Sequence, residues 1–240
     1  MISYVFHAAI YDPLYNGLVF LVDVIPTHDM GLAVIALTII ARIVIYPLSK
    51  RAIATQMAMK KIAPEVERVK VKHKDDREAQ SKAIFALYRE RGVHPFASFG
   101  LVLIQFPVLI GLYWVFYAGG LPAVDASLLY GFVHAPAAIN MSFLGFVDMG
   151  GRNILIAALA GITQLIYSRL SMGPRGSQTP TEATLSSDMA RSFDMQARYV
   201  LPVIIGVIGY TIPAAAPLYW TTSNIFMIGQ EYLAGRRFKG

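Results

Sequence analysis

One arginine stands inside a long apolar stretch of this sequence. The segment 31–50, GLAVIALTIIARIVIYPLSK, carries Arg42 with roughly two turns of apolar helix on either side. A guanidinium stays charged at any ordinary pH, and placing one at the centre of a bilayer costs about 2.5–3.5 kcal/mol on insertion scales. Helical spacing puts Thr38 and Tyr46 on the same face as Arg42. The pattern predicts one polar, charge-bearing face on an otherwise apolar helix.

Two structural roles compete with a functional role for Arg42. The side chain could extend to the membrane interface, or it could pair with a buried acid. The apolar turns on both sides argue against the first role, and we expect the other apolar segments to supply no carboxylate for the second. The favoured interpretation is a water-filled cavity that faces Arg42.

The composition is typical of a polytopic membrane protein. Hydrophobic residues make up 55% of the 240 positions and charged residues only 15%, whereas soluble domains carry about 25% charged residues. An α-helix of about 20 residues crosses a hydrocarbon core of about 30 Å. We expect an all-α polytopic membrane protein with five transmembrane helices, at about 31–50, 95–118, 153–170, 194–212 and 216–233.

Polar side chains are also expected at mid-depth in three of the other spans. Each of them alone could equally make an interhelical hydrogen bond, worth roughly 0.6 kcal/mol. Together with the arginine face they could line a hydrated pocket. The candidate site residues are Arg42, Thr38, Tyr46, Gln105, Thr163, Gln164, Tyr167, Trp220 and Asn224.

The N-terminal segment, 1–28, is apolar but interrupted by polar residues. Asp12 followed by Pro13 predicts the start of an amphipathic helix that lies on the outer membrane surface. A further, weakly hydrophobic span is the alternative for this segment. Thr27 or Asp29 can then cap the first true span, and residues 29–240 are expected to form the five-span core.

The segment 51–94 is strongly charged but keeps a helical period in its apolar residues. The pattern predicts a helical hairpin outside the membrane, between the first and second spans. Pro64 should bend or restart its first arm, and Asp75 or Asp76 can cap its second arm. A merely solvated linker is the alternative.

The basic residues predict the topology. Nearly all lysines and arginines lie in 50–94, in 171–198 and after residue 234, whereas 119–150 contains none. Because cytoplasmic loops are enriched in Lys and Arg, five spans place the N-terminus outside and the C-terminus in the cytoplasm. The net charge of +6 therefore follows the topology and does not indicate a specific nucleic-acid partner.

No pattern for catalysis, a cofactor or a metal is visible. The sequence has no cysteine, which excludes disulfide and thiolate chemistry. We find no HExxH motif, no Ser/His/Asp set and no glycine-rich phosphate loop. We expect a protein that is not an enzyme. A small-solute or anion channel that uses Arg42 for selectivity, and a structural assembly factor, are alternative functions.

Several motifs together resemble those of YidC/Oxa/Alb-type membrane-protein insertases in their minimal five-span bacterial form. They are LTIIARIVIYPLS in the first span, APE and LYRERGVHP in the charged hairpin, LVLIQFPVLIGLYWVF, FLGFVDM and PAAAPLYWTTSNIFMIGQEYL. One departure is His94, which stands where the family has an asparagine before the proline.

The resemblance implies a groove in the bacterial inner membrane that is open to the cytoplasm and to lipid but closed toward the outside. Arg42 matches the groove arginine of the family, and Gln164 and Trp220 match polar groove positions. The implied clients are nascent membrane proteins whose short N-terminal tails cross through the groove. The ribosome, a Sec-type translocon and membrane lipid are the further partners that the resemblance implies.

Overall fold

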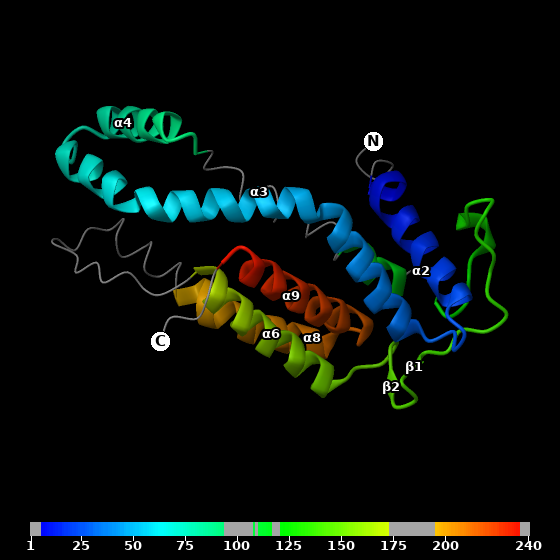
Figure 1. Ribbon diagram of the computed structural model, residues 1–240. Helices are drawn as coiled ribbons and strands as arrows, with labels where there is room; N and C mark the ends of the chain where they lie inside the picture. The colour runs from blue at the N-terminus through cyan, green and yellow to red at the C-terminus, as the bar shows by residue number, and fades with distance from the viewer. Residues whose placement is uncertain (1–5, 94–107, 109, 117–120, 173–194, 236–240) are drawn as a thin grey trace. The chain divides into compact units, whose positions relative to one another are not determined.

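The computed structural model describes residues 6–93, 108, 110–116, 121–172 and 195–235 (Figure 1). Most of the regular structure in these ranges is helical, as the predicted all-α class requires. The longer helices are α2 (Asp12–Val24), α3 (Met30–Lys72), α4 (Arg77–Glu90), α6 (Ile154–Met172), α8 (Leu201–Thr211) and α9 (Ala215–Leu233). The short elements are η1 (His7–Tyr11), η2 (Ala126–Leu128), η3 (Gln196–Val200) and the antiparallel strands β1 (Ser142–Phe143) and β2 (Val147–Asp148).

The chain divides into two compact units. Unit 1 consists of Met1–Val44 and Pro107–Gly240, and unit 2 of Ile45–Phe106. In unit 1, α6 packs against both α8 and α9 (Figure 1). The hydrophobic core also lies in unit 1, where α2, the start of α3, the loop after residue 121 and the start of α9 meet.

Two of the described helices, α3 and α6, are long and apolar enough to cross a membrane. They begin within one residue of the predicted first and third spans, and α9 nearly coincides with the predicted fifth span. The predicted second span, 95–118, falls mostly outside the described residues, which are helical at 108 and 110–116. The arrangement of five spans therefore stays a prediction.

The helix α3 continues without a break from the first predicted span into the predicted hairpin. Its 43 residues include Pro47 and Pro64, so the prediction that Pro64 restarts the arm is wrong. The sequence from 51 to 72 is rich in Ala and Lys and has no Gly or Asn that could end the helix. These strong helix formers outweigh the two proline defects.

Proline also explains the π-helical turn that precedes the N-terminal helix α2. The α-helix α2 begins at Asp12 as predicted, but the prediction that Asp12 is its N-cap is wrong, because the π-helical turn η1 already gives the preceding residues helical backbone. The Asp12 N–H donates to the His7 carbonyl five residues back, which makes the turn before Pro13 a π-turn. A wider turn accommodates the proline ring, which would clash with the carbonyl of an ordinary α-turn. The π-turn η3 precedes Pro202 in the same way.

Asp29 caps α3, as one of the two predicted capping residues. Its Oδ1 accepts from the N–H groups of Gly31 (2.7 Å) and Leu32 (3.1 Å). Its Oδ2 accepts from the Leu144 N–H at 2.9 Å, so the same carboxylate holds the β1–β2 hairpin against the start of α3. The Met30 N–H donates to the Asn140 carbonyl and extends this attachment.

The loop after residue 121 is held to α2 by side-chain hydrogen bonds to its backbone. The Asn16 amide donates to the Leu128 carbonyl (2.9 Å) and accepts from the Tyr130 N–H (2.6 Å). The Tyr15 hydroxyl accepts from the Asp125 N–H at 2.8 Å. Because these bonds join residues more than 100 positions apart, α2 is an integral part of unit 1.

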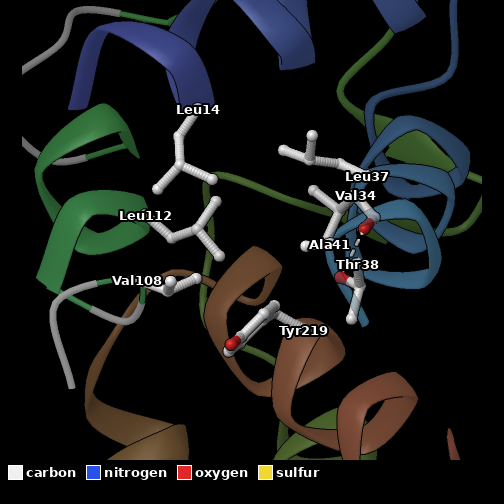
Figure 2. Close-up of a pocket in the computed structure, with 8 residues that line it drawn as sticks. All are labelled: Leu14, Val34, Leu37, Thr38, Ala41, Val108, Leu112 and Tyr219. Atoms are coloured by element: carbon white, nitrogen blue, oxygen red, sulfur yellow. Dashed lines mark hydrogen bonds between the residues drawn. The ribbon is translucent and has the colours of Figure 1, made fainter. Parts of the chain in front are cut away.

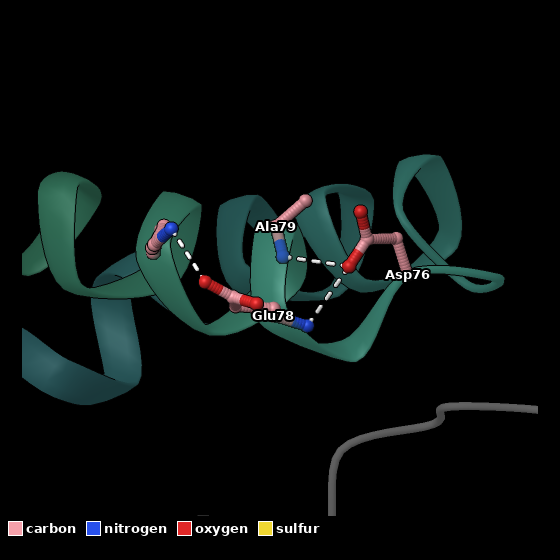
Figure 3. Close-up of polar contacts among 4 residues, drawn as sticks. Asp76, Glu78 and Ala79 are labelled. Atoms are coloured by element: carbon pink, nitrogen blue, oxygen red, sulfur yellow. Dashed lines mark hydrogen bonds and ion pairs between the residues drawn. The ribbon is translucent and has the colours of Figure 1, made fainter.

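In unit 2, Asp76 caps α4, as one of two predicted alternatives. Figure 3 shows its Oδ1 accepting from the N–H groups of Glu78 (3.0 Å) and Ala79 (2.9 Å). The end of α3 and α4 are joined by the Gln80 amide, which donates to the Lys70 carbonyl at 2.9 Å. An ion pair between Arg91 Nη2 and Glu65 Oε2, at 2.7 Å, joins α3 to the residue that follows α4.

The neighbouring residue Asp75 provides a matched control for this cap. We expect Asp76→Ala to destabilise α4 by about 1 kcal/mol, because two N–H groups of its first turn lose their acceptor. Asp75→Ala should leave α4 unchanged. Hydrogen exchange of the α4 amides measures the difference, and equal protection in the two variants would contradict the assignment of the cap.

Small residues bring α6 and α8 into close contact. A Cβ added at Gly161 would lie 3.1 Å from the Pro202 carbonyl oxygen, and one added at Gly209 would lie 3.5 Å from Ala157. Close backbone approach through Gly and Ala is typical of helix pairs in membranes, where dispersion contacts replace the hydrophobic effect. The α6–α8 pair has the packing expected of neighbouring spans.

A pair of alanine substitutions tests this packing. Gly161→Ala is expected to destabilise unit 1 by about 1–3 kcal/mol, because the added methyl pushes against backbone that cannot rotate away. Gly229→Ala in α9 should be neutral or slightly stabilising, because no atom from another described part of the chain lies within 4 Å of the added Cβ and alanine favours the helix. Thermal unfolding in detergent compares the two variants. A lower unfolding midpoint for Gly229→Ala than for Gly161→Ala would show that the close α6–α8 contact at Gly161 tolerates a methyl group.

Candidate functional site

Arg42 lies inside unit 1, with only 6% of its surface exposed. Its Nε donates to the Ser223 Oγ of α9 at 2.8 Å, and its Nη2 donates to the same oxygen. Ser223 is itself buried. The predicted polar face at the start of α3 therefore points into unit 1, and the Ser223 hydroxyl of α9 is one of the groups that contact its charge.

A second polar contact joins α9 to α6 next to the first. The Asn224 amide donates to Thr163 Oγ1 at 3.3 Å, and Thr163 in turn donates to the Leu159 carbonyl at 2.8 Å. Both side chains are buried. Ser223 and Asn224 are consecutive, so α9 makes its hydrogen bonds to α3 and to α6 at the same level of the helix. We call this set of four side chains, Arg42, Ser223, Asn224 and Thr163, the polar layer.

The structure brings together only part of the predicted site. Arg42, Thr163 and Asn224 belong to the polar layer that Ser223 completes, whereas the Thr38 hydroxyl donates to the Val34 carbonyl of its own helix. Tyr167, together with Tyr219 of α9, lies close enough to Arg42 to interact with it electrostatically. Gln164 and Tyr167 are half-buried, Trp220 packs partly against the core, Tyr46 lies in unit 2 with 36% of its surface exposed, and Gln105 lies outside the described residues.

A small cavity lies beside Thr38 and Ala41 of α3 (Figure 2). Its volume of about 10 Å³ is near the minimum for a single water molecule. Thr38 and Tyr219 are its only lining residues with a polar side chain, and Arg42 does not line it. The lining residues are Leu14, Val34, Leu37, Thr38, Ala41, Val108, Leu112 and Tyr219. This described cavity is apolar, so the predicted water-filled cavity at Arg42 stays a prediction.

Sequence reasoning missed two buried polar residues in the last helix. Ser223, the partner of Arg42, follows Trp220 by three positions, so helical spacing could have indicated it. Glu231 lies inside the predicted fifth span and is completely buried. The expectation that the other spans contain no carboxylate is therefore wrong, because Glu231 is part of the segment that was assigned to the membrane.

Further buried polar residues surround the end of α6. The Arg198 guanidinium in η3 donates from Nη2 to the Met172 carbonyl at 3.4 Å. Ser168 and Ser171 of α6 and Gln230 of α9 are buried as well. Among the described residues, no group of three or more His, Cys, Asp or Glu side chains is arranged to hold a metal ion.

Comparison with known proteins identifies the family. The family model described as 60Kd inner membrane protein matches residues 21–240, which is most of the chain. The chain belongs to this family. The resemblance to YidC/Oxa/Alb-type insertases that the sequence motifs indicated is thereby confirmed, as is the assignment to inner membrane proteins.

Relatives in the family carry the name of membrane protein insertases. The chain is 28% identical over 208 residues to the membrane protein insertase YidC of Clostridium tetani, covering 87% of this chain and 82% of the relative. It is 29% identical over 211 residues to the membrane protein insertase MisCA of Bacillus subtilis, covering 85% and 70%. The YidC of Methylobacillus flagellatus is 29% identical over 209 residues, but the match covers only 33% of that longer protein.

Proposed function

We propose that this chain is a membrane-protein insertase of the inner membrane. It moves short N-terminal tails of nascent single- or double-span proteins across the membrane through a hydrated groove that is open to the cytoplasm and contains Arg42. The client helices then pass into lipid. The observation that carries the proposal is the buried arginine on a helix of membrane-spanning length, held by a hydroxyl of α9, in a member of this family.

The charge of Arg42 gives the proposed groove its chemistry. A client tail with Asp or Glu loses hydration when it enters the membrane, and this desolvation is the main barrier to its crossing. A nearby guanidinium cannot lose its proton, so it offsets part of that cost by attraction to the carboxylate. Ser223 keeps the charge at one depth instead of letting the long side chain extend to the interface.

Exposed apolar faces supply the route into lipid. On α6, Leu155, Leu159 and Ile162 are exposed, and α9 exposes Ile225 and Leu233. Apolar area of this extent on membrane-length helices indicates contact with lipid tails. A client helix that moves along these faces buries its own apolar surface at about 25 cal/mol per Å². Partitioning of the helix, together with the membrane potential acting on an acidic tail, is the proposed source of free energy.

The proposal also assigns the membrane topology, the role of the charged hairpin and the partners. Five spans place the N-terminus outside and the C-terminus and the charged hairpin in the cytoplasm. The hairpin, formed by the end of α3 and by α4, captures the client before handover to the groove. Nascent membrane proteins are the proposed partners, and the ribosome and a Sec-type translocon are further proposed partners.

The absence of native cysteine makes a direct test of the hydrated groove simple. Arg42→Cys is expected to react with a charged, membrane-impermeant thiol reagent from the cytoplasmic side only, because a thiol must ionise in water to react. The matched control is Ile43→Cys, one position along the same helix, whose side chain is 58% exposed on the proposed lipid-facing side. Inverted vesicles and spheroplasts present the two sides separately. No reaction at position 42, or equal reaction at positions 42 and 43, would contradict a groove that is open to the cytoplasm.

A further inference from the structure

The tip of the β1–β2 hairpin exposes two large apolar side chains. Leu144 is 56% exposed and Phe146 is 75% exposed, with Gly145 between them. The segment from 142 to 147, SFLGFV, has no charged residue. In water, such a tip would leave a large apolar area hydrated, so its surroundings need an explanation.

The hairpin is held firmly to the start of α3. The Phe143 ring lies against Gly31, where an added Cβ would overlap it, and the Leu144 N–H donates to the Asp29 carboxylate at 2.9 Å. The isolated bridge between Asp29 and Asn140 fixes the base of the same loop. Figure 1 shows the two strands beside the beginning of α3. The tip therefore keeps a fixed height relative to the first apolar turn of the first candidate span.

The backbone at the tip favours residues other than leucine. Leu144 has φ +52° and Gly145 has φ +84°, both in the left-handed region. Glycine or asparagine adopts this conformation at lower cost than leucine does. The sequence thus keeps a large apolar side chain, 56% exposed, at a strained backbone position, which indicates a partner outside the chain.

We propose that this tip, Leu144–Phe146, inserts into the lipid interface of the outer leaflet and anchors the extracytoplasmic end of the first span. Three observations favour lipid over a protein partner. The apolar part of α3 begins at the level of Phe143, and the exposed Ile154 and Leu155 at the start of α6 extend the same kind of surface. The whole segment 119–150 lacks Lys and Arg, as expected on the outer side. The tip offers side chains but no charge by which a polar partner would recognise it.

A spin label at the tip tests the proposal in the full-length protein. Phe146→Cys carries the nitroxide, and Leu144→Cys provides a second site if the first variant does not fold. The protein is reconstituted into lipid vesicles at a density of several copies per vesicle. Collision with oxygen, which dissolves in lipid, is compared with collision by a water-soluble nickel chelate. Ile43→Cys, exposed on the candidate span, and Glu78→Cys, exposed on α4, serve as the lipid and water references.

The two reference sites decide the outcome. We expect the oxygen-to-nickel collision ratio at position 146 to lie near that at position 43 and several-fold above that at position 78. A ratio equal to that at position 78 would overturn the proposal, because the tip would then be hydrated. Spin–spin broadening at position 146 that disappears on dilution with unlabelled protein would also overturn it, because a second copy of the chain would then cover the tip. Either result leaves the proposed insertase function open to its own test at Arg42.

Discussion

Arg42→Ala is expected to reduce insertion of a single-span client with an acidic N-terminal tail by roughly tenfold to a hundredfold in proteoliposomes. Two unit charges 4 Å apart attract by about 4 kcal/mol at the effective dielectric constant of a protein surface, and every 1.4 kcal/mol changes a rate by a factor of ten. Water in the groove weakens this attraction, so the expected loss of insertion is smaller than the full attraction would give. Arg42→Glu should be worse than alanine, because it repels the client's carboxylate.

Arg42→Lys is expected to keep part of the activity, because a positive charge is what the proposed site requires. Lysine lacks the second nitrogen with which Arg42 contacts Ser223, so its ammonium is held less firmly. Ser223→Ala should therefore reduce insertion less than Arg42→Ala does, because it loosens the charge without removing it. Equal loss in the lysine and alanine variants would refute a purely electrostatic role.

The client provides the control for the Arg42 series. A client whose tail acids are replaced by Asn or Gln should insert at nearly the same rate with the native protein and with the Arg42→Ala variant, since no carboxylate remains for the guanidinium to attract. Combining Arg42→Ala with the neutral client tail completes a double-mutant cycle, which measures the interaction between the arginine and the client's carboxylates. An anion channel would behave differently: Arg42→Ala would change anion flux through the vesicles and leave client insertion as it was.

The sequence predicted the elements of unit 1 better than it predicted their contacts. Arg42 was identifiable because a permanent charge in a membrane-length apolar segment is costly to place in the bilayer, so its presence indicates a function. Asp29 and Asp76 were identifiable as caps because the cap acts on N–H groups two or three residues away. Ser223 was not identified, although it lies three positions after Trp220, because the residue that it contacts is 181 positions away in the sequence.

A long-range contact also explains why the hairpin of the outer loop was not predicted. The β1–β2 hairpin depends on the bond from Leu144 to Asp29, which are 115 positions apart, and no local pattern reports it. The length of α3 was missed for a local reason: Pro64 suggested a bend or restart of the helix, which the surrounding helix formers outweigh. Local chemistry therefore determined where helices begin, while tertiary contacts determined which polar groups meet.

Deletion of residues 55–90, replaced by a flexible Gly/Ser linker, is expected to abolish client insertion while leaving unit 1 folded. The deleted residues lie entirely within unit 2, and the hydrophobic core lies in unit 1. A linker of about ten residues spans roughly 16–19 Å on average and places little restraint on its ends. The loss would show that the charged segment has a task in capture or handover that the groove cannot perform alone.

A matched variant tests whether client insertion requires the charged segment itself or only the ion pair that stabilises it. Glu65→Gln combined with Arg91→Gln removes the ion pair between α3 and the residue after α4 but keeps every helix. Because both side chains are substantially exposed, the pair contributes at most about 1 kcal/mol, and insertion should stay close to that of the native protein. Thermal unfolding of unit 1 and client insertion are measured on the same preparations. An unchanged insertion rate in the deletion would remove the role assigned to the hairpin, whereas a loss accompanied by a lower unfolding midpoint of unit 1 would show that the segment acts through stability and not through capture.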